Sequence, residues 1–182
     1  MTEKPNAQTP VDPAEYVAAV AQHVSSVCII TTDCDGERYG LTATAVCSVC
    51  ADPPRLLVCV NKSGVTHDKI IQAGRFCVNV LTEDQDAVAM VFAGMGGDRA
   101  ARFDTGHWTS LTTGAPALDG AAAVFDCIIH DTVEQSTHTV LFGNVVATAH
   151  RSGRDTLLYG QRRFRQLRKV FTPMGKGSDG YL

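Results

Sequence analysis

The chain has 182 residues, of which 45% are hydrophobic and 19% are charged. Its length favours a single domain, and its composition is that of a globular protein rather than a disordered chain. No apolar run approaches the ~20 residues that span a bilayer, and the first residues, MTEKPNAQTPVDP, lack the apolar core of a secretory signal. We therefore expect no membrane contact and a cytoplasmic location, where the seven cysteines are reduced thiols.

The net charge of −3 is unevenly distributed along the chain. Residues 151–169 hold seven Arg or Lys and one Asp, a local charge of +6, which leaves −9 for the remainder. This segment is either a solvated or interface-facing surface or an anion site for a phosphorylated ligand. Nucleic acid is not an expected partner, because the acidic remainder would repel a polyanion.

The first third of the chain predicts one helix followed by strands. Asp12 can cap a helix that has Pro13 at its first position, and Glu15 completes the capping pattern. Further on, Pro53-Pro54 cannot continue a central strand. The expected elements are a flexible arm over 1–11, a helix from 12 to about 24, a turn at Asp35-Gly36, and strands over 27–33, 38–49 and 55–61.

The middle of the chain predicts two helices around a strand. Thr66 is the expected cap of the first helix, and Gly74 fits its C-terminal end. Thr82 is the expected cap of the second helix. The expected elements are helices over 63–74 and 82–94, a strand over 75–81, and a mobile connection over 95–103.

The last third of the chain predicts a long hairpin, with strands over 121–134 and 138–150. A short strand over 156–160, a helix over 161–169 and a loose tail over 171–182 follow. Strands dominate and most are joined by hairpins, so the pattern favours a closed or partly closed antiparallel barrel over a doubly wound sheet. The domain is expected to cover 12–170.

Cys47 and Cys50 have the C-x-x-C spacing of a metal or thiol-redox motif. A redox pair lies at a helix N-terminus, and a zinc site needs a second pair of ligands, which the sequence lacks. Side chains three residues apart on a strand point to opposite faces. We therefore expect these cysteines to pack like the others, most of which lie in apolar strands, and we expect no metal.

The remaining motifs are weaker. The glycines of AGMGGDR fit neither a dinucleotide fingerprint nor a P-loop. His67 stands at a predicted helix N-terminus, which favours an anion, and His138 stands at the start of a strand. On local grounds each is as well explained as an ordinary surface residue, and no Ser-His-Asp arrangement follows from the spacing.

The stretch TATA, residues 42–45, has no bulk. Small side chains on a strand allow a flat ligand to lie against the backbone, whose N–H and C=O groups can bind the edge of a heterocycle. Thr42, Thr44 and Ser48 add neutral hydroxyls. NKSGVTH, residues 61–67, offers an amide, a cation, hydroxyls and a helix N-terminus, which together suit a phosphate. Small residues also serve tight sheet packing, so both interpretations stay open.

Several ordered segments together resemble a known family. GLTATAVCSVCADPPRLLVCVNKSGVTHD, then GRFCVNVL, Arg102-Phe103, TGAPALDGAAAVFDC and THTVLFGNVV are similar to the flavin reductase-like family, the FMN-binding split-barrel reductases. The resemblance covers roughly residues 14–168. It implies a mainly β, antiparallel, Greek-key-like split barrel with inserted helices, a homodimer, and a flavin bound near the subunit interface.

The resemblance also implies an activity and a set of site residues. The activity is hydride transfer from NADH or NADPH to FMN or FAD, which supplies reduced flavin to a separate oxygenase acting on aromatic compounds. His138 is the expected catalytic residue beside the nicotinamide, although the family's Gly-Asp before it is Ser136-Thr137 in this chain. The expected flavin and nucleotide contacts are Thr42, Ala43, Thr44, Ala45, Val46, Ser48, Asn61, Lys62, Ser63, Thr66, His67, Arg102 and Phe103. Tyr159, Arg162 and Arg163 are weaker candidates for contacts with cofactor phosphates.

Two other functions remain open at this level. One is a related flavoprotein that reduces another acceptor, such as a corrinoid or a quinone. The other is a flavin-binding module without enzymatic activity. The sequence does not decide between FMN and FAD, between NADH and NADPH, or between a bound flavin and a released one.

Overall fold

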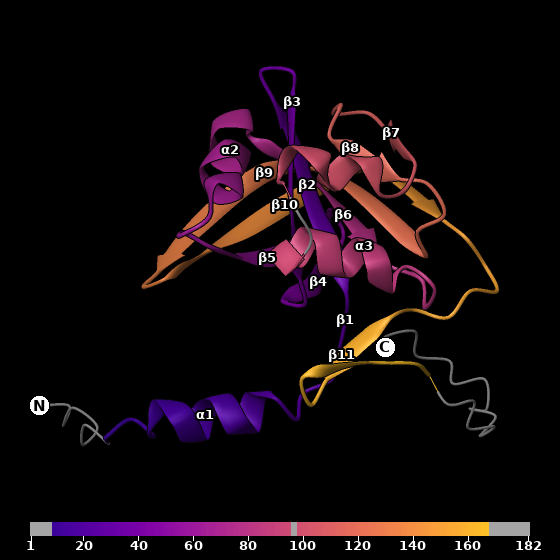
Figure 1. The fold of residues 1–182 in the computed structure, drawn as a ribbon. Coiled ribbons are helices and arrows are strands. Elements are labelled where there is room, and N and C mark those ends of the chain that lie inside the picture. Colours follow the sequence, from indigo (N-terminus) through magenta and orange to yellow (C-terminus); the bar gives the residue numbers. More distant parts are fainter. Residues whose placement is uncertain (1–8, 96–97, 168–182) are drawn as a thin grey trace, which may run out of the picture.

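The computed structural model describes residues 9–95 and 98–167. Its centre is a seven-stranded antiparallel sheet in the order β3-β2-β6-β9-β10-β5-β4 (Figure 1). The strands are β2 Cys28–Cys34, β3 Glu37–Ala43, β4 Val46–Ala51, β5 Pro54–Asn61, β6 Arg75–Val80, β9 Ala123–Gln135 and β10 His138–His150. The mainly β, antiparallel architecture that the sequence predicts is thus confirmed.

The central strands are buried on both faces, as their continuous apolar character predicts. Alternate residues of β2 and β6 face two different apolar clusters, because side chains alternate along a strand. Ile30 and Phe76 belong to one cluster with residues of β5, β10 and helix α2, Val65–Ala73. Ile29 and Cys77 belong to the other, which the segments between β6 and β9 cover.

The expected strand over 38–49 is two strands. β3 ends at Ala43 and β4 begins at Val46, so Thr44 and Ala45 form a break between the two edge strands of the sheet. The backbone N–H of Cys59 in β5 donates to the carbonyl of Ala45 at 3.0 Å, which fixes the break against the sheet. The TATA stretch, residues 42–45, therefore covers the end of β3 and this break.

Helix α2, Val65–Ala73, ends as predicted, with Gly74 in the left-handed conformation at φ 66°. Its start differs from the prediction, because Gly64 is the N-terminal cap and no side chain caps the helix. The Thr66 hydroxyl is instead buried and donates to the carbonyl of Gly40 at 3.4 Å. Thr66 therefore ties the helix to β3.

The prediction of one helix from Thr82 to Gly94 was only partly right. Helix α3 spans Asp86–Met90 and continues into a wide turn over Val91–Met95, where Gly94 has a φ of 86°. Thr82 bridges to Thr156 and so extends strand pairing instead of capping. A 3₁₀ turn, Ala100–Asp104, and the short paired strands β7 Trp108–Ser110 and β8 Pro116–Leu118 complete this layer.

Helix α1, Pro13–Val20, lies apart from the barrel (Figure 1). Asp12 caps it as predicted, and its carboxylate accepts from the backbone N–H of Ala14 at 2.8 Å. None of its residues is buried. It connects to the barrel through β1 Ser25–Ser26, which joins a small sheet in the order β1-β11-β12.

The expected C-terminal helix over 161–169 was wrong within the described residues. β11 Leu158–Gly160 and β12 Arg163–Arg165 form a hairpin, and Gln161 and Arg162 make its turn at positive φ. The rings of Tyr159 and Phe164 pack across it with centroids 5.8 Å apart. Residues 168 and 169, like the predicted tail over 171–182, lie outside the described residues. No helix in the described part of the chain is long and apolar enough to cross a membrane.

Candidate functional site

A hollow of ≈ 410 Å³ lies where the break after β3 meets the end of β5 and the start of β10. We call it the small-residue hollow. Its lining comes from separate parts of the sequence, which the sheet brings together. The lining residues are Leu41, Thr42, Ala43, Thr44, Ala45, Cys59, Asn61, Ser63, Gly64, Phe92, Ala93 and His138.

The fold keeps one wall of this hollow thin. β3 is an edge strand, and such a strand carries backbone N–H and C=O groups that point away from its neighbour. A Cβ on Gly40 would lie 2.6 Å from the ring of Phe92, so glycine allows that ring to pack directly under β3. The hydroxyl of Thr42 donates to the carbonyl of Ala89 at 2.7 Å, which holds α3 against the same strand.

The loop after β5 forms the second wall. The side-chain oxygen of Asn61 accepts from the N–H of Ser63 at 2.9 Å, and the N–H of Lys62 donates to the carbonyl of Thr137 at 3.0 Å. The Lys62 ammonium lies 2.7 Å from the Glu134 carboxylate. The hydrogen bond from Lys62, and then that from Thr139, lowers the pKa of Glu134. The charge of Lys62 is therefore partly balanced before any anion arrives.

His138 stands at the rim, exposed, with its Cα paired to that of Asn61. Its ring Nδ1 lies 2.9 Å from the Thr137 hydroxyl. The two-residue turn before it, Ser136-Thr137, closes the hairpin with Ser136 at a φ of 36°. The chain thus makes a tight turn without the family's glycine.

Two predicted contacts lie behind the hollow instead of lining it. Thr66 bonds Gly40 as described above. His67 is 8% exposed, and its Nε2 lies 2.9 Å from the Thr139 hydroxyl while its Nδ1 lies 2.8 Å from the Asp68 carboxylate. Both residues hold the wall in place, and a direct contact between them and a ligand stays a prediction.

Arg102 and Phe103 come from the 3₁₀ turn on the other side of β3. Arg102 donates from Nη1 to the Gly40 carbonyl at 3.4 Å, and burial, with a smaller effect of Arg99, lowers its pKa. Its buried Nε–H has no acceptor among the described residues. Phe103 is buried against Phe92 and Trp108, with ring centroids 5.0 Å from each. Its ring is thus part of the core rather than of the hollow.

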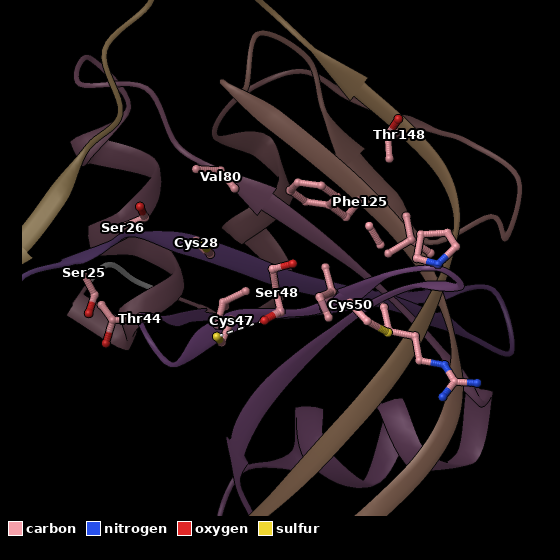
Figure 2. A pocket seen from close by; sticks show the side chains of 16 residues that line it. Ser25, Ser26, Cys28, Thr44, Cys47, Ser48, Cys50, Val80, Phe125 and Thr148 are labelled. Atoms are coloured by element: carbon pink, nitrogen blue, oxygen red, sulfur yellow. Dashed lines mark hydrogen bonds between the residues drawn. The ribbon is translucent and has the colours of Figure 1, made fainter. Parts of the chain in front are cut away.

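Val46 and Ser48 line a second, neighbouring hollow of ≈ 480 Å³ together with Cys47 and Cys50 (Figure 2). We call it the cysteine hollow. Thr44 belongs to both hollows. The expectation that the two cysteines face opposite ways was wrong, because a bulge between Ser48 and Cys50 adds a residue and resets the alternation of β4.

All seven cysteines are free thiols, and Cys28, Cys34, Cys77 and Cys127 are buried. Within the described residues no three His, Cys, Asp or Glu side chains come together as metal ligands. Cys47 donates to the carbonyl of Ser48 and Cys50 to that of Pro53, so each thiol bonds a carbonyl that is close to it in the sequence. Nothing in this geometry joins the pair into one reactive centre.

The C-terminal candidates are not brought to the hollows. Tyr159 and Arg163 lie in the small sheet beside α1. Part of the basic segment is neutralised, since Arg151 pairs with Asp119 at 2.9 Å and Arg154 pairs with Asp84. The contact of Tyr159 and Arg163 with cofactor phosphates stays a prediction.

Sequence reasoning missed Phe92 and Ala93, which line the small-residue hollow. They follow α3, and no spacing in the sequence connects them with β3. The available signal in the sequence was Gly40, which the ring of Phe92 approaches closely in the structure. A lone glycine in a strand indicates only that something packs closely against it.

Comparisons with known proteins show which protein family the chain belongs to. The family model described as "Flavin reductase like domain" matches residues 20–168. An FMN reductase (NADH) RutF from Pseudomonas syringae is 43% identical over 149 residues, which cover 82% of this chain and 83% of that one. RutF 2 from Methylorubrum extorquens is 45% identical over 157 residues, covering 86% and 91%.

Solved structures agree in fold. The NADH:FAD oxidoreductase SgcE6 of Streptomyces globisporus superposes with a TM-score of 0.80 at 30% identity, over 95% of this chain and 99% of that one. The styrene monooxygenase flavin reductase of Pseudomonas putida gives 0.77 at 27% identity, over 86% and 99%. The protein belongs to the flavin reductase-like family and has its split-barrel fold.

Proposed function

We propose that this protein is an NADH-dependent FMN reductase that releases reduced FMN to a separate oxygenase. The relatives most similar in sequence carry the name FMN reductase (NADH). The observation that carries the proposal is the small-residue hollow, where residues 41–45, 61, 63–64 and 138 meet although they are far apart in sequence.

The lining suits a flat heterocycle. Ala43, Ala45, Ser63 and Gly64 leave room beside the backbone, and nothing lies within 4 Å of where a Cβ on Gly64 would be. A flavin bound there supplies the chemistry: it takes a hydride from the nicotinamide and a proton from water, and NADH leaves as NAD⁺. The protein's task is to hold both rings in contact distance and to exclude solvent.

The residues then have distinct roles. The edge of β3 and the Thr44-Ala45 break support the ring system through backbone groups. Asn61, Lys62 and Ser63 face the phosphate end of the ligand, where the ammonium of Lys62 can exchange Glu134 for phosphate. His138, exposed at the rim, contacts the nicotinamide and orients it.

A titration of the purified protein tests the proposal. NADH consumption is followed at 340 nm under anaerobic conditions, with no flavin, with FMN and with FAD added. We expect turnover that requires free FMN and exceeds that with FAD. A protein that stays yellow and is never bleached by NADH would instead be a flavin-binding module. Bleaching without turnover of free flavin would indicate another acceptor, such as a corrinoid or a quinone.

We further propose a homodimer. The cysteine hollow has an apolar lining of Val46, Leu56, Val80, Phe125 and Val145, and helix α1 exposes Tyr16, Val17 and Val20 away from the barrel. Both surfaces suit contact with a second copy. The seven free thiols suit the cytoplasm. The aromatic nature of the oxygenase's substrate stays a prediction.

A further inference from the structure

A chain of polar contacts runs behind His138, from the surface to helix α2. Lys62 bonds Glu134 at 2.7 Å, and Glu134 lies 3.1 Å from the hydroxyl of Thr139. The same hydroxyl lies 2.9 Å from Nε2 of His67. Thr139 is fully buried, whereas Lys62 and Glu134 reach solvent.

The direction of these hydrogen bonds follows from their chemistry. The hydroxyl of Thr139 has one proton, and the carboxylate of Glu134 can only accept, so Thr139 donates to Glu134. Its oxygen then accepts from Nε2–H of His67, and because the other ring nitrogen, Nδ1, faces the Asp68 carboxylate, both ring nitrogens act as donors in this arrangement. Thr139 therefore connects strand β9 to helix α2 beneath the rim.

Thr139 also adjoins His138 directly. Successive side chains of a strand point to opposite faces, so when Thr139 is anchored inward, His138 is directed outward to the small-residue hollow. Strand pairing with Asn61 and Gln135 holds the backbone of His138, and Ser136, two residues earlier, turns the chain at a positive φ. The buried anchor of Thr139 adds a side-chain restraint to this pairing.

We propose that Thr139, held between Glu134 and His67, is a positioning residue that sets the pose of His138 for hydride transfer. This inference rests on the role proposed above for His138. A displacement of about 1 Å at a reacting group can cost about 100-fold in rate. Loss of the Thr139 hydroxyl should therefore slow hydride transfer while the flavin, which contacts other residues, still binds.

Two substitutions separate the hydroxyl from the volume of the side chain. Thr139→Val keeps the branched shape and removes the hydroxyl, whereas Thr139→Ser keeps the hydroxyl. In stopped-flow reduction by NADH we expect at least about a tenfold loss in Thr139→Val and recovery to within about threefold in Thr139→Ser. The flavin Kd, measured by fluorescence quenching, should change less than about threefold in both. The control is Thr132→Val, which makes the same substitution at an exposed threonine of β9.

A double-mutant cycle with His138→Ala shows whether Thr139 acts through His138. We expect Thr139→Val to slow reduction in the wild-type background and to have almost no further effect when His138 is absent. An equal loss in both backgrounds, or no loss in the wild type, would overturn the inference and leave the role of His138 intact. If His138→Ala alone leaves the rate unchanged, the role proposed for His138 fails first, and the inference with it.

The protein without ligand provides an independent readout. The imidazole signal of His138 in a ¹H–¹³C NMR spectrum, assigned with His138→Ala, should be single and narrow in wild type and in Thr139→Ser. In Thr139→Val it should shift and broaden as the ring samples several poses; an unchanged signal would contradict the inference. If Thr139→Val does not fold, Glu134→Ala removes the acceptor of the Thr139 hydroxyl at a largely exposed side chain, and it should broaden the imidazole signal of His138 in the same way.

Discussion

Small side chains give the small-residue hollow its shape. Thr44 stands at the break between β3 and β4 and lines both hollows. A larger side chain there would fill the space beside the backbone that a flat ring needs, whereas the thiols of Cys47 and Cys50 bond carbonyls close to them in the sequence. Bulk at position 44 should therefore matter more than the chemistry of the cysteines.

Thr44→Leu should weaken FMN binding by more than about tenfold, a loss of at least about 1.4 kcal/mol, because the longer apolar side chain reaches into the ring's place. Fluorescence quenching of FMN measures the Kd. The double variant Cys47→Ser with Cys50→Ser is the control and should bind nearly as wild type. Tight binding to Thr44→Leu would remove the hollow as the flavin site.

Buried thiols predict how stability depends on pH. Burial raises the pKa of Cys28 and of Cys127 from the ordinary value of 9.0 to about 12. A raised pKa means that the folded state keeps the proton while the unfolded chain releases it. This contribution to stability is complete below about pH 9 and is lost as pH rises toward 12.

The free energy of unfolding should therefore fall above pH 9, by up to about 1.4 kcal/mol per pH unit for each such thiol. Cys28→Val should make this fall less steep, as urea unfolding at pH 8, 9, 10 and 10.5 would show. Cys47→Ser, at a side chain exposed in the folded state as well, should leave the slope unchanged. Equal slopes for wild type and Cys28→Val would contradict the expectation.

At the scale of elements, the hairpin β9–β10 positions the site. Its strands were predictable because both are long, apolar and separated by a short polar stretch. The bulge in β4 was not predictable, because one extra residue in a strand leaves no mark on its composition. β12 was mistaken for a helix because Arg, Gln and Leu favour helices, whereas the pairing of Tyr159 with Phe164 decides the outcome.

The candidate site, like the fold, could be predicted only in part. Contiguous stretches such as residues 42–45 and 61–63 were found because their residue types share one chemistry. Phe92 was missed because only the folded sheet decides which face a side chain takes. Phe103 and His67 are buried, and their contact with a ligand stays a prediction. Sequence patterns locate such segments, and packing selects the side chains within them.

The turn of this hairpin yields a prediction for stability. Ser136 occupies a positive φ, which costs an L-residue about 1–2 kcal/mol, whereas glycine adopts it freely but loses about 0.5–1 kcal/mol of backbone entropy. Ser136→Gly should thus stabilise the fold by about 0.5–1 kcal/mol in urea unfolding. Ser110→Gly, in strand β7 without positive φ, should destabilise it. A loss of stability in Ser136→Gly would show that the turn is not strained.

At the scale of the whole molecule, α1 and the small sheet β1-β11-β12 stand apart from the barrel (Figure 1). Tyr16, Val17 and Val20 are 60%, 51% and 48% exposed on a helix with no buried residue. An isolated eight-residue helix is marginal in water unless its apolar side is covered. In the proposed homodimer the second copy provides that cover.

Negative charges on the side of α1 that carries Val17 and Val20 should separate the subunits. The variant Val17→Glu with Val20→Glu should elute as a single chain in light-scattering chromatography, whereas wild type should have twice the 19.4 kDa chain mass. Ala18→Glu, on a different side of the same helix, should remain dimeric. A double variant that stays dimeric would place the interface elsewhere, for example over the cysteine hollow.

The pairing of Ser25 and Ser26 with Tyr159 and Leu158 affects how the chain is made. A ribosome delivers the strands in order, and β9 and β10 must both be made before they can join β6 to β5 in the central sheet. β1 waits longer still, because its partner β11 follows β10 in the chain. Helix α1 is reached through β1, so it gains a fixed place only after β11 has been made. The proposed dimer contact through α1 is therefore completed after the barrel strands of each copy.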